Sequence, residues 1–129
     1  MVRRAIYRSS AIILIFVFLL AFMSSAFADK SFAVDMAGVF TAEEKESLEQ
    51  KAIALGRQFD MDIVIVTTSD AEGKSSRDYA DDYFDYNGYG TGADRDGILF
   101  LIDFDNSEAY ISTSGSAIRY LTDERIESI

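Results

Sequence analysis

Alternating stretches of hydrophobic and polar residues divide the chain after residue 28 into helical and strand segments. Thr41 and Glu44 match a capping box, in which the threonine hydroxyl accepts from a free N–H of the first helical turn and the glutamate reaches back. Apolar residues then recur at helical spacing on one face, namely Leu48, Ala52, Leu55 and Phe59. The pattern predicts a helix from this box to about Phe59, preceded by a lead-in segment over residues 29–40.

Two uninterrupted apolar runs predict buried strands. Residues 63–66 and 98–102 contain only isoleucine, valine, leucine and phenylalanine, which is typical of strands covered on both faces in α/β sheets. Between them, Ser75 or Ser76 can cap a second helix that runs to about Tyr86. Its predicted buried stripe consists of Tyr79, Ala80, Tyr83 and Phe84.

The remaining segments complete the predicted sheet. Residues 87–97 form a long loop rich in Gly and Asp, and residues 103–107 can turn the chain tightly. Residues 108–113 alternate polar and apolar positions, as an antiparallel edge strand does. A last capped segment covers residues 122–126. The order α-β-α-β-β-α predicts an α/β fold, a three-layer α/β/α sandwich with a small mixed sheet.

The first 28 residues match a secretory signal peptide. Three arginines in the first eight residues form a basic start, an apolar run follows from Ala11 to Met23, and an Ala-x-Ala pattern ends at Ala28. Small side chains at these positions suit signal peptidase. We therefore expect cleavage after Ala28, which leaves residues 29–129 as a mature domain outside the cytoplasm.

An uncleaved membrane anchor is the alternative. The apolar run has 13 residues, whereas roughly 20 are needed to span the hydrocarbon core. Extending the run to include Ala5 and Ile6 requires burial of Arg8, which is unfavourable. Both interpretations give the folded part an extracytoplasmic location, either secreted or held at the membrane.

Charge and composition narrow the possible partners and chemistries. The chain has a net charge of −10, with 12 basic and 22 acidic residues. Cleavage removes three arginines and no acidic residue, which leaves nine basic residues and a net charge of −13. Such a surface repels phosphate backbones and attracts cations, so we expect no nucleic-acid partner. Because the chain lacks His and Cys, it can form no Ser-His-Asp triad, thiol nucleophile or ordinary zinc site.

Several short strings, in this order and spacing, resemble the TPM domain family. They are Val34–Gly38 before the capped helix, Asp62–Thr68, Gly73–Ser75 with Tyr79-Ala80, the Gly/Asp loop into Gly97–Ile102, Ile111–Gly115 and Leu121–Asp123. The resemblance covers residues 33–129. The family is named after a thylakoid-lumen phosphatase, a photosystem II repair protein and a nematode acetylcholine-receptor modulator.

The resemblance implies a range of uses rather than one reaction. Some members are reported as acid phosphatases, some bind calcium, and others act as lumenal or periplasmic partners in assembly and repair. Family domains usually continue with more helix, which implies that the last helix of this bacterial, exported member is incomplete. Many bacterial members also carry a later membrane segment, which implies anchoring of the full-length protein. Tyr86 or Tyr89 occupies the site where many members carry Trp.

The strongest candidate for chemistry is a group of five aspartates. Asp94 and Asp96 lie in the Gly/Asp loop, Asp82 and Asp85 lie at the end of the second helix, and Asp123 heads the last segment. The antiparallel strand is expected to return the chain to the same end of the sheet. Ca²⁺ binds six to eight oxygen atoms, which flexible Gly/Asp loops supply, so the group predicts a site for Ca²⁺ or Mg²⁺. The alternative is a solvated acidic surface in which Asp and Gly serve turn geometry.

Residues 100–107 look like the signature of haloacid dehalogenases, in which a buried strand delivers an Asp-x-Asp pair. One of these carboxylates, Asp103 or Asp105 here, attacks phosphorus and the other shuttles a proton. However, Ser107 occupies a position where that superfamily prefers Thr or Val, and the following residues predict a strand rather than a helix. A hairpin turn is the favoured interpretation, because Asp and Asn are common in turns.

Two functions follow from these patterns. The first is a divalent-cation-binding interaction module in the assembly or maintenance of envelope proteins, with an envelope or membrane protein as partner. The alternative is a metal-assisted acid phosphatase acting on phosphate monoesters, in which a metal held by Asp82, Asp85, Asp94 and Asp96 polarises the ester. The sequence assigns no catalytic residue. The acidic charge, the missing nucleophile machinery and the uses of the family favour the interaction module.

Overall fold

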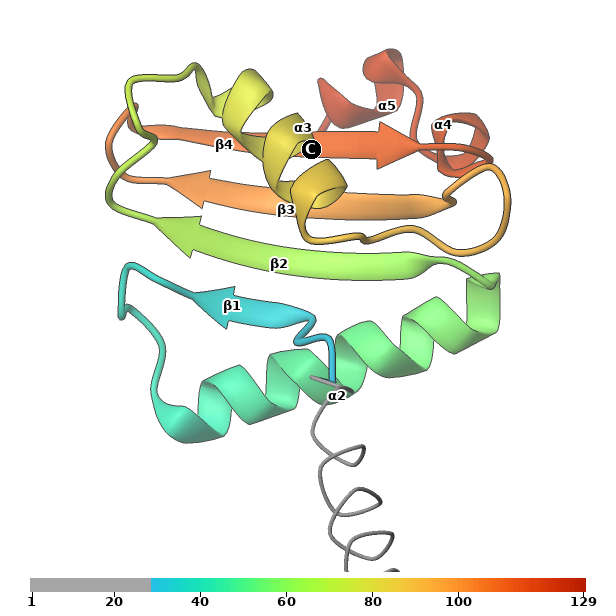
Figure 1. Cartoon of the computed structure of the whole chain (residues 1–129), viewed down its shortest axis with the longest axis horizontal. Helices are drawn as coiled ribbons and strands as arrows, with labels where there is room; N and C mark the ends of the chain where they lie inside the picture. Colours follow the sequence, from blue (N-terminus) through green and yellow to red (C-terminus); the bar gives the residue numbers. More distant parts are fainter. Residues whose placement is uncertain (1–28) are drawn as a thin grey trace, which may run out of the picture. The chain divides into compact units, whose positions relative to one another are not determined.

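The computed structural model describes residues 29–129, and the expected signal peptide lies outside the described residues. The elements, in chain order, are β1 (Ala33–Asp35), α2 (Ala42–Phe59), β2 (Asp62–Thr68), α3 (Ser76–Tyr86), β3 (Gly97–Asp103), β4 (Glu108–Ser114), α4 (Ala117–Tyr120) and α5 (Asp123–Ile126) (Figure 1). The predicted helices and strands are found close to their expected bounds. Within this part of the chain, no helix has the length and apolar character needed to cross a membrane.

The sheet is mixed, as predicted, with the strand order β1-β2-β3-β4. β1 pairs with β2 and β2 pairs with β3 in parallel, whereas β3 and β4 form an antiparallel hairpin. β1 is an addition to the predicted order, because residues 29–40 were expected to form only a lead-in segment. Three residues are too few to show a period of two, and this strand depends on its pairing with β2, in which Ala33 lies opposite Ile65.

Helix α2 begins and ends at the residues that cap it. The Thr41 hydroxyl accepts from Glu44 N–H at 3.2 Å, and the Glu44 carboxylate accepts from Thr41 N–H at 2.9 Å, which confirms the predicted capping box. Asp60 follows the helix in the left-handed backbone region (φ 53°), and its N–H bonds to the Gly56 carbonyl. The helix packs against β1 and β2, and Ala52 is its buried residue.

The face of the sheet that carries α3, which we call the front face, holds the hydrophobic core (Figure 1). Val64 and Val66 of β2 and Leu99 and Leu101 of β3 are fully buried there. From α3 the core includes three residues of the predicted stripe, Tyr79, Ala80 and Phe84, while Tyr83 packs against the cluster and is partly buried. The predicted apolar runs therefore do form the centre of the fold.

Tyr89, in the loop between α3 and β3, extends this layer toward β1. Its ring centroid lies between 6.0 and 6.3 Å from those of Phe32, Tyr83 and Phe84. Its hydroxyl donates to the Ser31 carbonyl at 2.6 Å. Burial, followed by the charges around it, raises the pKa of Tyr89 to about 12. Helix α3 and this ring together cover the front face from β4 to β1.

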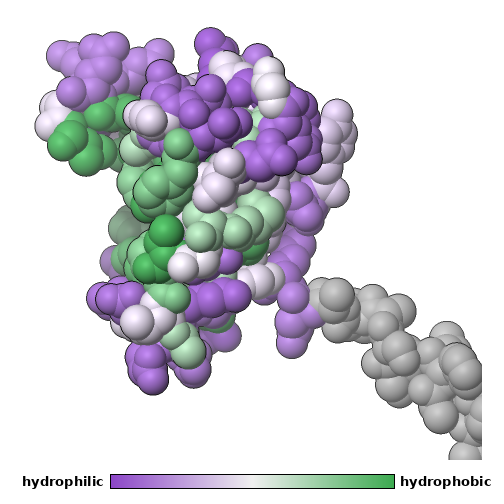
Figure 2. All heavy atoms as spheres, turned by 90° about the vertical axis from the view of Figure 1, so that its left-hand side faces the viewer, coloured by the Kyte–Doolittle hydropathy of each residue, from purple (hydrophilic) through white to green (hydrophobic). Residues whose placement is uncertain are grey.

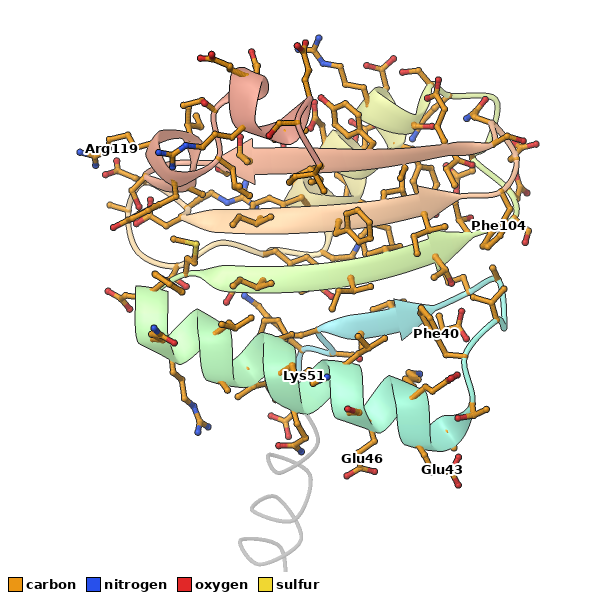
Figure 3. All side chains as sticks on the ribbon, turned by 180° about the vertical axis from the view of Figure 1, so that it is seen from behind. Phe40, Glu43, Glu46, Lys51, Phe104 and Arg119 are labelled. Carbon is orange, nitrogen blue, oxygen red and sulfur yellow. The ribbon has the colours of Figure 1, made fainter. Side chains whose placement is uncertain are left out.

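The opposite, back face is covered over only part of its width. Helix α2 packs against β1 and β2, and among the described elements no helix packs extensively against the back of β3. Ile98, Phe100 and Ile102 alternate with the buried core residues of β3 and are only partly buried. Figure 3 shows this face from behind. The prediction that residues 98–102 are buried on both faces is therefore right for the front face and wrong for the back face.

Gly97 begins β3 in close contact with Phe84 of α3. A Cβ atom at position 97 would lie 2.6 Å from Phe84 Cζ. We predict that Gly97→Ala lowers the free energy of unfolding by about 1–3 kcal/mol through overpacking, as measured by urea denaturation. The same change should cost less in a Phe84→Leu background, because the smaller side chain leaves room for the methyl group. Strictly additive losses in the double variant would contradict this steric account.

Candidate functional site

Two of the five predicted metal ligands form ion pairs with basic residues. Asp82 Oδ2 lies 2.9 Å from Lys74 Nζ, and Asp85 Oδ1 lies 3.0 Å from Arg95 Nη1. Lys74 Nζ also lies 3.4 Å from a carboxylate oxygen of Glu72. The hydrogen bond to Asp82, with a smaller contribution from Glu72, raises the pKa of Lys74. A metal ion would have to compete with these cations for the carboxylates.

The other three predicted ligands do not converge on that pair. Asp96 Oδ1 accepts from the Ser116 N–H at 2.5 Å, which fastens the Gly/Asp loop to the chain after β4. Asp94 is exposed in the same loop. Asp123 is the first residue of α5. Burial raises the pKa of Tyr110 on β4, the charge of Asp81 adds to this effect, and the charge of Asp123 makes a smaller contribution. After β4 the chain does return to Asp96, as predicted. The residue that contacts Asp96 is Ser116, and α4 lies between Ser116 and Asp123 in the chain.

Within residues 29–129, no three acidic side chains are grouped so that they could hold a metal ion together. Three of the five predicted ligands also have partners in the fold, which are Lys74, Arg95 and the Ser116 N–H. The five aspartates are therefore not a preformed site. Binding of Ca²⁺ or Mg²⁺ by these residues stays a prediction.

Asp103, at the end of β3, holds three segments together. It is 1% exposed, and it accepts from Ser76 Oγ at 2.8 Å and from Asn106 Nδ2 at 2.7 Å. The backbone N–H groups of Asp105 and Asn106 donate to its other oxygen at 3.0 and 3.1 Å. Burial acts to raise the pKa of Asp103, but these hydrogen bonds, led by those from Asn106, outweigh it and lower the pKa.

These contacts identify the Asp-x-Asp pair as part of a hairpin turn. Asp103 has every oxygen occupied by a donor from the turn or from the start of α3. Asp105 Oδ2 accepts from the Ala71 N–H at 3.1 Å and so joins the turn to the loop after β2. A nucleophilic carboxylate needs an oxygen free to attack a substrate. The arrangement therefore supports the turn interpretation favoured by the sequence.

Asp35 has a similar role at the end of β1, and the sequence analysis did not single it out. Its carboxylate accepts from the Val39 N–H at 3.1 Å and from the Phe40 N–H at 2.9 Å, and also from the Thr67 hydroxyl. The hydrogen bond from Thr67, followed by that from Phe40, lowers the pKa of Asp35. Gly38, with φ 67°, completes the turn between them. The sequence signal for this role was an Asp shortly before a Gly. That pattern is common to many turns, so it does not single out Asp35.

Two of the shallow hollows on the described surface lie beside α3 and along α2. One, of about 250 Å³, lies beside α3 and is lined by Lys74 and its acidic partners, by Met36 and Asn87, and by three tyrosines: Tyr79, Tyr83 and Tyr86. Tyr79 and Tyr83 stack with centroids 6.1 Å apart, and Tyr86 is 81% exposed. The other, of about 430 Å³, lies along the first turns of α2, where Phe40 and Leu48 meet Glu43, Glu44 and Lys51 (Figure 3). Neither hollow contains a nucleophile paired with a base.

The largest unexplained feature is apolar and lies on the back face. We call it the uncovered face, and it consists of Ile98, Phe100 and Ile102 of β3 with Ala109, Ile111 and Thr113 of β4, which are paired across the hairpin. Leu55 and Phe59, on the apolar stripe of α2, are 43% and 44% exposed. Phe104, which follows β3, is 49% exposed. Figure 2 views the molecule from the left-hand side of Figure 1, at the end of the sheet, and shows hydrophobic side chains there between hydrophilic regions above and below.

Comparisons with known proteins identify the family. Residues 33–129 match the TPM domain. The chain belongs to the TPM domain family. It is 33% identical over 95 residues to UPF0603 protein YdjH of Bacillus subtilis, a match that covers 74% of this chain and 35% of that protein. The N-terminal domain of a protein from P. gingivalis, solved by NMR, has a similar fold with a TM-score of 0.66 and 19% identity, covering 78% of this chain and 65% of that one.

The TPM assignment made from short strings in the sequence is therefore confirmed, and the solved relative supports the fold. The chain spans about a third of the length of the curated relative that it matches. What the sequence did not reveal is the uncovered face of this TPM domain. A signal for it was present in the sequence. Residues 98–102 are apolar on both faces of the strand, while the predicted order offers only two long helices to cover the two faces of the sheet.

Replacement of Asp103 tests its role in the TPM fold. Asp103→Asn places an amide N–H₂ where Ser76 and Asn106 now donate, so we predict a loss of about 2 kcal/mol in the free energy of unfolding. Asp105→Asn keeps an acceptor oxygen for Ala71 and is exposed, so it serves as a matched control with a loss below about 1 kcal/mol. Urea denaturation at neutral pH measures both, and equal losses would show that burial of Asp103 has no special weight.

The lowered pKa values predict acid sensitivity. Asp35 and Asp103 have folded-state pKa values below the ordinary 3.8, so the unfolded chain binds protons more readily than the folded one. Their contribution is fully present above that value and is lost as the pH falls through the folded-state pKa. Thermal unfolding followed from pH 6 to pH 2 should therefore give a falling midpoint. The fall below pH 4 should be shallower in Asp103→Asn, and an unchanged slope in that variant would contradict the assignment.

Proposed function

We propose that this TPM domain is an extracytoplasmic interaction module that holds a partner protein in the cell envelope. The observation that carries the proposal is the uncovered face, where apolar side chains of β3 and β4 are only partly buried, together with Leu55 and Phe59 of α2, which are more than 40% exposed. An apolar strip of this extent is costly to leave in water, at roughly 25 cal/mol per Å². A binding partner would remove that cost.

The state of the carboxylates also favours binding over catalysis. Asp103 and Asp35 are occupied by donors from their own loops, and Asp82 and Asp85 face Lys74 and Arg95. The phosphatase alternative needs a metal on Asp82, Asp85, Asp94 and Asp96, because an acidic surface otherwise repels phosphate. No observation on the described residues favours that reading over the interaction module.

The expected leader and the net charge supply the cellular setting of the proposal. Cleavage after Ala28 would release an acidic domain with a charge of −13 outside the cytoplasm. An acidic domain attracts basic surfaces over long range and so speeds their encounter with it. An envelope or membrane protein that presents a basic, partly apolar segment therefore fits both the charge and the uncovered face.

Site-specific photo-crosslinking in the cell tests the proposal. A photoreactive residue at Leu55, which is exposed on the apolar stripe of α2, should yield a discrete crosslinked product with an envelope protein. The same residue at Tyr86, which is 81% exposed on α3, is the matched control and should not yield that product. Equal products from both positions, or none from Leu55, would count against the uncovered face as the interface.

We also keep a divalent cation as part of this proposal, because Asp82, Asp85, Asp94 and Asp96 lie on α3 and the loop that follows it. Binding requires Asp82 to leave Lys74, so Lys74→Gln should strengthen it. Thermal unfolding with Ca²⁺ at 100 times its Kd should add about 2.7 kcal/mol to stability. The gain should disappear in the Asp94→Asn, Asp96→Asn double variant. The absence of any shift with Ca²⁺ or Mg²⁺ would remove the cation, and with it the phosphatase alternative, while leaving the interaction module in place.

A further inference from the structure

The chain leaves β1 and β2 toward opposite faces of the sheet. After β1 it passes to α2 on the back face, and after β2 it passes to α3 on the front face. In open α/β sheets, neighbouring parallel strands whose connections diverge in this way leave a crevice outside their carboxyl ends, and ligands bind there. β1 and β2 are parallel neighbours, so their carboxyl ends are where this fold offers a ligand site. These ends point to the left in Figure 1, the side that faces the viewer in Figure 2.

The hollow beside α3 lies at this place. It has a volume of about 250 Å³, and it is lined by Met36, which follows β1, and by Glu72 and Lys74, which follow β2. The rest of its wall comes from α3 and Asn87, and none of it belongs to the uncovered face. Pockets for drug-sized ligands have roughly 300–1,000 Å³. This hollow is smaller, and so it fits one small ring rather than a nucleotide or a peptide.

One polar group in the wall has no partner in the fold. Tyr79 is only 7% exposed, and its hydroxyl makes no hydrogen bond with the part of the chain that the structure describes. Among the described residues, no side-chain oxygen or nitrogen is both sealed from solvent and without a partner. The hydroxyl therefore opens to the hollow that Tyr79 lines. A ring held by packing, with its hydroxyl at a cavity wall, is a preset donor and acceptor for a ligand.

The charged groups of the hollow are already matched to one another. Lys74 Nζ lies 2.9 Å from an Asp82 oxygen and 3.4 Å from a Glu72 oxygen. An added cation would compete with Lys74, and an added anion would meet acidic side chains on a domain with a net charge of −13. Each carboxylate still accepts further hydrogen bonds, and the ammonium group has a third N–H to donate. The hollow therefore suits a neutral ligand that carries several hydroxyl groups.

The rim of the hollow adds apolar contacts for such a ligand. Tyr86 is 81% exposed and Met36 is 48% exposed, and both line the hollow. An aromatic ring is an apolar surface with a polar tip, and a methionine side chain adapts its shape to what it contacts. A sugar ring matches this combination, because C–H groups form an apolar face and hydroxyl groups surround the edge.

We infer that the hollow at the carboxyl ends of β1 and β2 binds one neutral sugar ring, either free or as a unit of a glycan. Tyr86 packs against the C–H face of the ring. The Tyr79 hydroxyl and Lys74 donate to oxygens of the sugar, and Asp82 accepts from its hydroxyl groups. This site goes beyond the proposed interaction module and does not use the uncovered face, so either one can fail without the other.

Saturation-transfer NMR on the full-length protein tests this site, because it detects the ligand protons that touch the protein. The probes are N-acetylglucosamine, glucose and galactose, and the control is sorbitol, a neutral polyol without a ring. We expect transfer to one face of at least one sugar and none to sorbitol. Tyr79→Phe, which removes only the hydroxyl, should raise the Kd about fivefold, and Tyr86→Ala should raise it about tenfold. Tyr120→Ala, at an exposed tyrosine outside the hollow, is the matched control and should leave the Kd unchanged.

Charged forms of the same ring test whether the ligand is neutral. Glucosamine, a cation at pH 6, and N-acetylglucosamine 6-phosphate, an anion, should both bind more weakly than N-acetylglucosamine. Tighter binding of either one would assign the hollow to an ion and overturn the inference. So would equal transfer to sorbitol, no transfer to any of the three sugars, or an unchanged Kd in both Tyr79→Phe and Tyr86→Ala. If the site holds, tighter binding of the N-acetylglucosamine trimer than of the monomer assigns it to a glycan chain, and equal binding assigns it to a free sugar.

Discussion

The rest of this structure depends on one constraint, which is that both faces of a four-stranded sheet must be covered. Parallel strands bury both faces, and one helix covers about two strands, so four strands need cover of about two helices on each face. The described chain supplies α3 on the front of β3 and β4 and α2 on the back of β1 and β2. On the front, Tyr89 fills the remaining space beside β1 through its contacts with Phe32 and the Ser31 carbonyl. On the back, no helix among the described residues packs extensively against β3.

Acidic side chains perform in this domain the work that prolines and disulfides perform in many small exported folds. The chain has neither Pro nor Cys, so its loops must be fixed by other means. Asp103 fixes the β3–β4 turn to the start of α3, and Asp96 fixes the Gly/Asp loop to the chain after β4. Asp35 fixes the turn after β1, and Glu49 of α2 accepts from the N–H groups of Phe32 and Ala33 at the start of β1. Charge-assisted hydrogen bonds to backbone N–H groups are among the stronger ones available to a loop.

This use of carboxylates explains which parts of the molecule were predictable. Period and capping identified α2, α3, β2, β3 and β4, because those signals are local and Thr41, Glu44 and Ser75 act within their own helix. β1 was missed because its three residues become a strand only through pairing with β2. The sequence analysis grouped Asp94, Asp96 and Asp123 because acidic residues are abundant in these segments. Their actual surroundings depend on the direction that the chain follows through α4 after Ser116. A sequence can indicate that oxygen ligands are abundant, but it cannot tell whether Lys74, Arg95 or a backbone N–H already binds them.

Net charge and exposed apolar surface have opposite effects on association, and their combination limits what can bind. Apolar strips on β-sheets tend to draw copies of the same chain together. Two domains that each carry −13 repel one another, and the repulsion persists over about 8–10 Å at physiological ionic strength. The same repulsion would oppose self-association of residues 29–129 through the uncovered face. A partner with basic residues around an apolar stripe would gain from both effects, so the acidic surface that opposes self-association would favour such a ligand of the proposed interaction module.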